Sequence, residues 1–194
     1  MNRLRIGVAL YNAGRYLAAH EPLEELWLDA PTGERDDCLQ GLIQASAAVY
    51  KARRGNDAGA AGLAESASEY INDCSTVDAE ALRPWLSEVA VDPAVARDTE
   101  PPELRLDGRA TGIYDLSPSE VVAAGEAVAE AEEDELIKSA TKYVELDLED
   151  GAATSPFVTL TLDYISDPTP IVRQRLTEHV ERREMRESDV EGLF

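Results

Sequence analysis

The residues best suited to chemistry stand close together near the amino terminus, in the run Ala19-His20-Glu21-Pro22-Leu23-Glu24-Glu25-Leu26-Trp27. On a helix, His20, Glu24 and Trp27 share one face with Leu23, because positions i, i+3, i+4 and i+7 lie on the same side. Trp27 and Leu23 favour burial, whereas a buried imidazole or carboxylate needs a hydrogen-bonding partner. The spacing therefore predicts a half-buried polar site along one side of a helix.

Metal binding and acid–base catalysis are the two kinds of chemistry that this spacing allows. His20 and Glu24 have the i, i+4 spacing of helical metal sites, with Glu21 beside them as a supporting group. A neutral His20 paired with Glu24 could also act as the general base of a hydrolase-type enzyme. However, the run lacks the second histidine of the zinc metalloprotease motif, and no nucleophile stands in a recognisable motif. We therefore expect no cofactor, lean towards no enzymatic activity, and keep a metal at His20 and Glu24 as the alternative.

A second helix, expected over residues 34–54, supplies the partners for this face. Gln40 and Gln44 are one turn apart on it, and Tyr50 lies on its apolar stripe. A network of hydrogen bonds between the two helices would satisfy the buried polar groups. We favour a site that packs the helices or holds a small ligand or partner without chemistry. Its candidate residues are the polar and aromatic groups of both helices: His20, Glu21, Glu24, Trp27, Gln40, Gln44 and Tyr50.

The chain as a whole is expected to be mainly α, with two parts. Residues 1–95 predict an antiparallel helical bundle, and loop signals between residues 91 and 118 suggest a boundary near residue 95. Residues 96–194 predict a small α+β appendage with a helix at about 118–131, a β-hairpin at about 143–164 and a helix at about 170–187. The hairpin rests on the alternation of apolar and polar residues in 143–148 and 157–164.

Two further groups of residues have structural interpretations. Arg182, Arg183 and Arg186 cluster near the end of the last expected helix, where cations complement the helix dipole. Cys38 and Cys74 have neither zinc-site spacing nor a redox motif, so we expect both to be buried as small apolar residues.

The composition is strongly acidic, with 39 acidic residues, 18 basic residues and a formal net charge of −21. Such a charge repels nucleic acid and anionic membranes, and it destabilises a compact chain unless salt screens it. No apolar run is long enough to cross a membrane, and the apolar piece at residues 6–10 is too short for a signal peptide. We expect a cytoplasmic protein of a halophile, with no nucleic-acid or membrane partner. A homo-oligomer or an unidentified protein partner stays open.

Four blocks between residues 7 and 63 together resemble the family known as domain of unknown function 309. They are Gly7…Leu10-Tyr11-Asn12-x-Gly14-x-Tyr16, Ala19-His20-Glu21-x-Leu23-Glu24-x-x-Trp27, Leu39-Gln40-Gly41-Leu42-Ile43-Gln44 and Gly55-Asn56…Gly59-Ala60. The resemblance implies a compact antiparallel helical bundle and no established activity, and the composition suggests a haloarchaeal member. Pro22 stands where the family is expected to have an aliphatic residue. Lys51 stands where the family often has a second histidine, so a metal site that used that histidine would be incomplete here.

Overall fold

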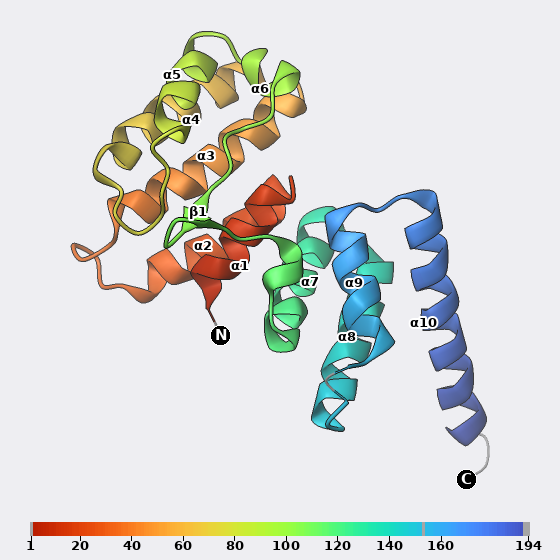
Figure 1. Cartoon of the computed structure of the whole chain (residues 1–194). Helices are drawn as coiled ribbons and strands as arrows, with labels where there is room; N and C mark the ends of the chain where they lie inside the picture. The colour runs from red at the N-terminus through yellow and green to blue at the C-terminus, as the bar shows by residue number, and fades with distance from the viewer. Residues whose placement is uncertain (1, 153, 192–194) are drawn as a thin grey trace. The chain divides into compact units, whose positions relative to one another are not determined.

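The computed structural model describes residues 2–152 and 154–191 and divides the chain into two compact units. The first, called the amino-terminal unit, spans Asn2–Asp115, and the second, the carboxy-terminal unit, begins at Leu116 (Figure 1). Both are built from helices, and the described residues hold one two-stranded antiparallel sheet. The prediction of a mainly α protein is therefore confirmed.

The amino-terminal unit contains six α-helices, two short 3₁₀ turns and the two strands among its described residues. In chain order they are α1 (Arg3–Asn12), α2 (Tyr16–Asp29), α3 (Asp37–Arg53), α4 (Asp57–Tyr70), η1 (Ile71–Asp73), α5 (Leu82–Val91), α6 (Val95–Asp98), β1 (Arg105–Leu106), β2 (Arg109–Ala110) and η2 (Ile113–Asp115). Three helices begin with a side-chain cap, as short polar residues at this position favour. The caps are Asn2 for α1, Asp36 for α3 and Asn56 for α4.

Each helix from α1 to α4 packs against the next one in the chain. The approach of α1 to α2 is very close, because a Cβ atom on Gly7 would lie 2.5 Å from Cγ of Leu23. Leu10, Leu42 and Leu86 are fully buried in the core between these helices. The positive φ of 75° at Gly14 allows the tight turn from α1 to α2.

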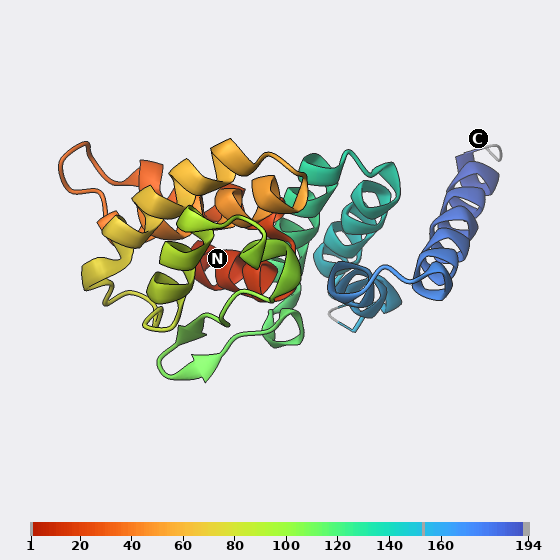
Figure 2. The same ribbon diagram turned by 90° about the horizontal axis from the view of Figure 1, so that it is seen from above.

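The segment after α6 belongs to the amino-terminal unit and is held there by Asn12. The Asn12 side-chain amide donates to the carbonyls of Leu104, at 2.8 Å, and Thr111, at 3.0 Å, and its oxygen accepts from the Leu104 N–H at 2.9 Å. Strands β1 and β2 form a short hairpin between these two anchor points (Figure 2). The structure thus divides the chain after Asp115, whereas the sequence suggested a boundary near residue 95.

The carboxy-terminal unit contains α7 (Pro118–Glu132), α8 (Glu135–Glu149), α9 (Pro156–Ser166) and α10 (Pro170–Glu191). The hairpin predicted at about 143–164 is wrong, since α8 and α9 occupy this part of the chain. In α8 the buried side chains are Ile137, Ala140, Thr141, Tyr143 and Val144, which largely follow the helical period. Runs of six to eight residues are too short to separate that period from the alternation of a strand. Ser155, expected between two strands, instead caps α9 by accepting from the Phe157 N–H.

Two further expectations are corrected. Cys38 and Cys74 form a disulfide, with their Cα atoms 4.9 Å apart, so they are not free thiols. The final helix continues to Glu191, so Arg182, Arg183 and Arg186 lie within α10 and not at its end. The helix dipole acts mainly on the last turn and does not explain that cluster.

Candidate functional site

Helix α2 carries the polar pair that the sequence singled out, but on its flank and not on its inner face. Ala19 and Leu23 are fully buried, and each residue turns the helix by about 100°. The next residues along the chain, His20 and Glu24, consequently lie beside the buried stripe. Their side chains are 33% and 48% exposed, and His20 Nδ1 is 3.7 Å from Glu24 Oε2. The two groups therefore meet at the surface, where they form an ion pair when His20 is protonated.

Trp27 lies half-buried near the end of α2, beneath an arginine from the following loop. The guanidinium carbon of Arg35 is 4.1 Å from the ring centroid, which is a cation–π contact. Arg35 Nε also donates to the Ala30 carbonyl at 3.3 Å, which fixes the loop over the indole. The indole Nε1 is buried and has no hydrogen-bond acceptor among the described residues. Trp27 thus offers a donor that its own unit does not use.

The remaining predicted residues lie on or near the α2–α3 pair without forming one network. Gln40, Gln44 and Tyr50 are half-buried on α3, and Glu21 is half-buried on α2. The side-chain oxygen of Gln44 is buried and accepts no hydrogen bond within the described part of the chain. Tyr50 contacts the guanidinium of Arg54 at 5.5 Å. In the part of the chain described, no hydrogen bond joins His20, Trp27, Gln44 or Tyr50 to one another.

The positions of His20 and Glu24 limit how many metal ligands this surface can supply. Among residues 2–152 and 154–191, no three side chains of His, Cys, Asp or Glu gather closely enough to hold a metal ion. His20 and Glu24 could therefore supply two ligands, and the other positions would fall to water or to a partner. Two ligands on an exposed helix flank are fewer than the three or four protein ligands of a typical zinc site.

Sequence reasoning missed Arg35 and Leu28 as members of this surface. Arg35 lies in a loop, where no periodicity indicates which way a side chain points, and its contact with Trp27 depends on how the loop folds. Leu28 follows Trp27 and is 51% exposed, although leucine is usually buried. We call His20, Glu24, Trp27, Leu28 and Arg35 the α2 surface.

A cavity of about 780 Å³ lies elsewhere in the amino-terminal unit, beside the disulfide. It is lined by the segment from Ile71 to Pro84 and by the hairpin tip at Asp107 and Gly108. The Thr76 hydroxyl donates to Asp36 at 2.6 Å, which ties this segment to the start of α3. None of the α2 surface residues lines it, so the two features are separate.

No helix in the described part of the chain combines the length and apolarity that a membrane span requires.

The family comparison concerns the amino-terminal unit. Residues 4–63 match the model of the family described as domain of unknown function (DUF309). An uncharacterized protein of Aquifex aeolicus (strain VF5) is 29% identical over 99 residues, which cover 49% of this chain and 29% of that protein. The chain thus spans less than a third of the length of this relative. No solved structure matches the chain. The similarity to the DUF309 family therefore runs from α1 into α4 and includes the whole α2 surface.

Proposed function

We propose that the amino-terminal unit is a non-enzymatic binding unit and that the α2 surface is its contact site. The carrying observation is Leu28, an apolar side chain next to Trp27 that is 51% exposed. Covering such a side chain removes apolar surface from water, which favours association. A half-exposed leucine and a stacked arginine beside it are typical of protein interfaces.

The occupant that we propose is a second copy of the same chain. A two-fold interface places one surface against itself, so that surface must carry complementary groups. The α2 surface has both signs of charge, in Glu24 and Arg35, next to the apolar Trp27 and Leu28. The cavity beside the disulfide is lined by other residues, which favours a protein partner over a small ligand at this site.

The proposed setting is the cytoplasm of a halophile, with neither nucleic acid nor membrane as a partner. The net charge of −21 supports this setting, because molar salt shortens the Debye length to about 3 Å and screens the repulsion between like charges. The same salt screens charge pairs across an interface, so the apolar contacts of Trp27 and Leu28 would carry most of the association.

Sedimentation equilibrium in 2 M salt tests the proposal with Leu28→Asp as the variant. We expect the wild type to form dimers and Leu28→Asp to be monomeric while keeping its helical circular-dichroism signal. Val91→Asp is the matched control, since Val91 is an apolar residue of the same unit that is 87% exposed. A monomeric wild type, or equal dissociation by both variants, would contradict the proposal.

The His20–Glu24 pair supports one alternative, a metal-dependent or acid–base hydrolase. His20→Ala and Glu24→Gln would then abolish a hydrolytic activity while the protein stays folded, because both side chains are at the surface. Metal analysis before and after chelation, with hydrolase screening of the wild type, distinguishes this alternative. Stoichiometric metal or an activity lost in both variants would favour the enzyme over the binding unit.

A further inference from the structure

The carboxy-terminal unit contains a cavity whose charge is opposite to that of the chain as a whole. Its volume is about 320 Å³, and it lies among the end of α8, the start of α9 and one face of α10. The residues that matter are an aspartate, an aromatic ring and four basic side chains: Asp147, Phe157, His179, Arg182, Arg183 and Arg186. Three arginines and one carboxylate thus line this cavity, in a protein with more than twice as many acidic as basic residues.

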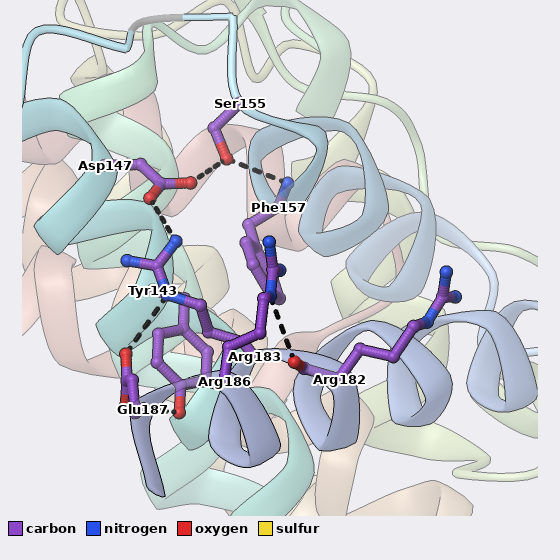
Figure 3. A network of polar contacts seen from close by, with 8 residues as sticks. All are labelled: Tyr143, Asp147, Ser155, Phe157, Arg182, Arg183, Arg186 and Glu187. Carbon is purple, nitrogen blue, oxygen red and sulfur yellow. Dashed lines mark hydrogen bonds and ion pairs between the residues drawn. The ribbon is translucent and has the colours of Figure 1, made fainter. Parts of the chain in front are cut away.

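The aspartate and one arginine of this cavity already satisfy each other. Asp147 Oδ1 accepts from Arg183 Nη1 at 3.0 Å, and Asp147 Oδ2 accepts from the Ser155 hydroxyl (Figure 3). Arg183 Nε donates in addition to Glu187 at 3.1 Å. Both oxygens of Asp147 are therefore occupied, and the charge of Arg183 is balanced.

The other two arginines keep more of their charge available. Arg182 has one carboxylate neighbour, Glu178, at 3.7 Å, and its Nε donates to the carbonyl of the same residue. Arg186 donates from Nε to the Arg182 carbonyl at 3.1 Å. The two terminal nitrogens of its guanidinium are not used in this hydrogen bond. No carboxylate within the described residues forms an ion pair with Arg186. Its side chain is exposed, so these nitrogens can reach a ligand.

The first turn of α9 adds a second source of positive potential. This helix has 11 residues, and its first two residues, Pro156 and Phe157, line the cavity. The amino-terminal end of a helix carries a partial positive charge that favours anions. The Phe157 ring is almost fully buried and contacts the His179 ring edge-on at 6.3 Å between centroids. An apolar wall thus stands next to the basic groups.

We infer that this cavity binds a small phosphate monoester, with its phosphate at Arg186 and its apolar group against Phe157. The planar guanidinium fork of arginine matches two phosphate oxygens, and the partial positive charge at the start of α9 favours the anion. Ligand cavities span about 300–1,000 Å³, so this volume fits a phosphate with one ring or a short chain.

Calorimetric titration with phenyl phosphate tests this site, in the lowest salt concentration that preserves the helical circular-dichroism signal. We expect saturable binding of one molecule per chain to the wild type. Arg186→Gln is expected to weaken it about tenfold or more, because a charge-assisted hydrogen bond is lost. Its melting temperature should not change, since this side chain is exposed and has no carboxylate partner in the described residues.

Arg175→Gln is the matched control, because Arg175 is an exposed arginine of α10 that does not line the cavity. It removes the same charge from the same helix, and binding should stay within twofold of the wild type. Inorganic phosphate should bind more weakly than phenyl phosphate, and phenol should not bind. No binding of phenyl phosphate by the wild type would overturn the inference, as would equal binding by Arg186→Gln or an equal loss in Arg175→Gln.

Discussion

In the amino-terminal unit, α1 and α2 meet at a glycine, whereas in the carboxy-terminal unit charged groups join α8 to α10. Gly7 lets α1 approach Leu23 closely, and the disulfide ties the residue after η1 to the start of α3. In the ion pairs of this unit, such as the one between Arg53 and Glu100, one of the two side chains is largely exposed. Apolar contact and a covalent bond therefore hold the core of this unit, and ion pairs such as Arg3 with Glu25 lie at its surface.

Helix α10 presents the opposite case. Its buried apolar side chains, among the residues described, are Leu176 and Val180. Near its start, Arg173 donates to Asp134 at 3.1 Å and to the Tyr164 hydroxyl, which itself donates to Asp134. Farther along, Arg183 reaches Asp147 on α8. The comparison suggests that, in a very acidic chain, a helix with little apolar surface is held by paired charges.

Removing the disulfide should give the largest difference between the two units. Reduction, or Cys38→Ala with Cys74→Ala, is expected to lower the unfolding free energy of the amino-terminal unit by about 3–4 kcal/mol, because the bond closes a loop with a sequence separation of 36. A cytoplasm keeps most thiols reduced, so this measurement also shows how much stability the protein would lose there. Urea unfolding with and without reductant measures the change.

The carboxy-terminal unit contains no cysteine and serves as the internal control. Its transition should be unaffected by reductant, as followed by hydrogen exchange of its own backbone amides. Equal loss of stability in both units would show that they do not unfold separately, and the contrast between them would fail.

Adding one methyl group at a helix crossing should give the next largest effect. Gly7→Ala places a carbon 2.5 Å from Cγ of Leu23, and Gly125→Ala places one 2.2 Å from the Thr141 hydroxyl oxygen. We expect each to cost about 1–3 kcal/mol in thermal unfolding, because the helices must move apart. Gly62→Ala on α4 meets nothing within 4 Å and should stabilise by up to about 1 kcal/mol.

A second variant distinguishes crowding from other causes at Gly125. Thr141→Ala removes the atoms that the new methyl group would meet, so combining it with Gly125→Ala should recover part of the lost stability. Strictly additive losses would show that close approach of α7 and α8 is not the reason for this glycine.

Changing the charge of Asp134 should give the smallest effect and a characteristic pH dependence. Burial raises the pKa of Asp134, but hydrogen bonds from Tyr164, the Leu136 N–H and Arg173 outweigh it, so this pKa lies below its usual value. The stabilisation is therefore fully present above about pH 4 and is lost as the pH falls through the lower pKa of the folded state. Asp134→Asn should cost about 1 kcal/mol at neutral pH, since Arg173 is half-exposed.

Urea unfolding at a series of pH values measures this difference between wild type and variant. Glu135→Gln is the matched control, because its ion pair with Lys138 is largely exposed and should contribute less than about 0.5 kcal/mol. A difference for Asp134→Asn that grows in acid would contradict the assigned role.

The same centre also predicts behaviour in alkali. Burial and the hydrogen bond to Asp134 raise the pKa of Tyr164 to about 12. A raised pKa gives stability that is present below about pH 10 and is lost as the pH rises through the folded-state value. Tyrosinate absorbance of the wild type and of Tyr164→Phe would follow this loss.

The sequence predicted the helices well where apolar spacing extended over several turns, as in α3. The prediction of strands at 143–164 failed for two reasons. Each run there is short enough to fit both the period of a strand and that of a helix. The segment with the helix cap at Ser155 also resembles a turn between strands. The sequence also placed His20 and Glu24 on the right helix, where both lie half-exposed beside the inner face that Ala19 and Leu23 occupy.

Features that depend on contacts distant in the chain could not be predicted in this way. The pairing of Cys38 with Cys74 requires η1 to fold back onto α3, which no local pattern encodes. The same holds for Arg35 over Trp27 and for the basic cavity, which forms only when α8, α9 and α10 are packed together. The sequence showed a cluster of Arg182, Arg183 and Arg186 but placed it at a helix end. Because α10 continues to Glu191, the cluster lies inside the helix, where the helix dipole does not account for it.

The three hydrogen bonds of Asn12 have an implication for how this protein can vary. Each of them goes to a backbone atom of Leu104 or Thr111 and none to a side chain. Most side chains between Leu104 and Thr111 could therefore be replaced, provided that the backbone path is preserved. A substitution of Asn12, in contrast, would leave its three backbone partners unsatisfied. We therefore expect natural and engineered insertions to be accepted at the hairpin tip, since Asn12 and the backbone of Asp78 hold the segment outside it.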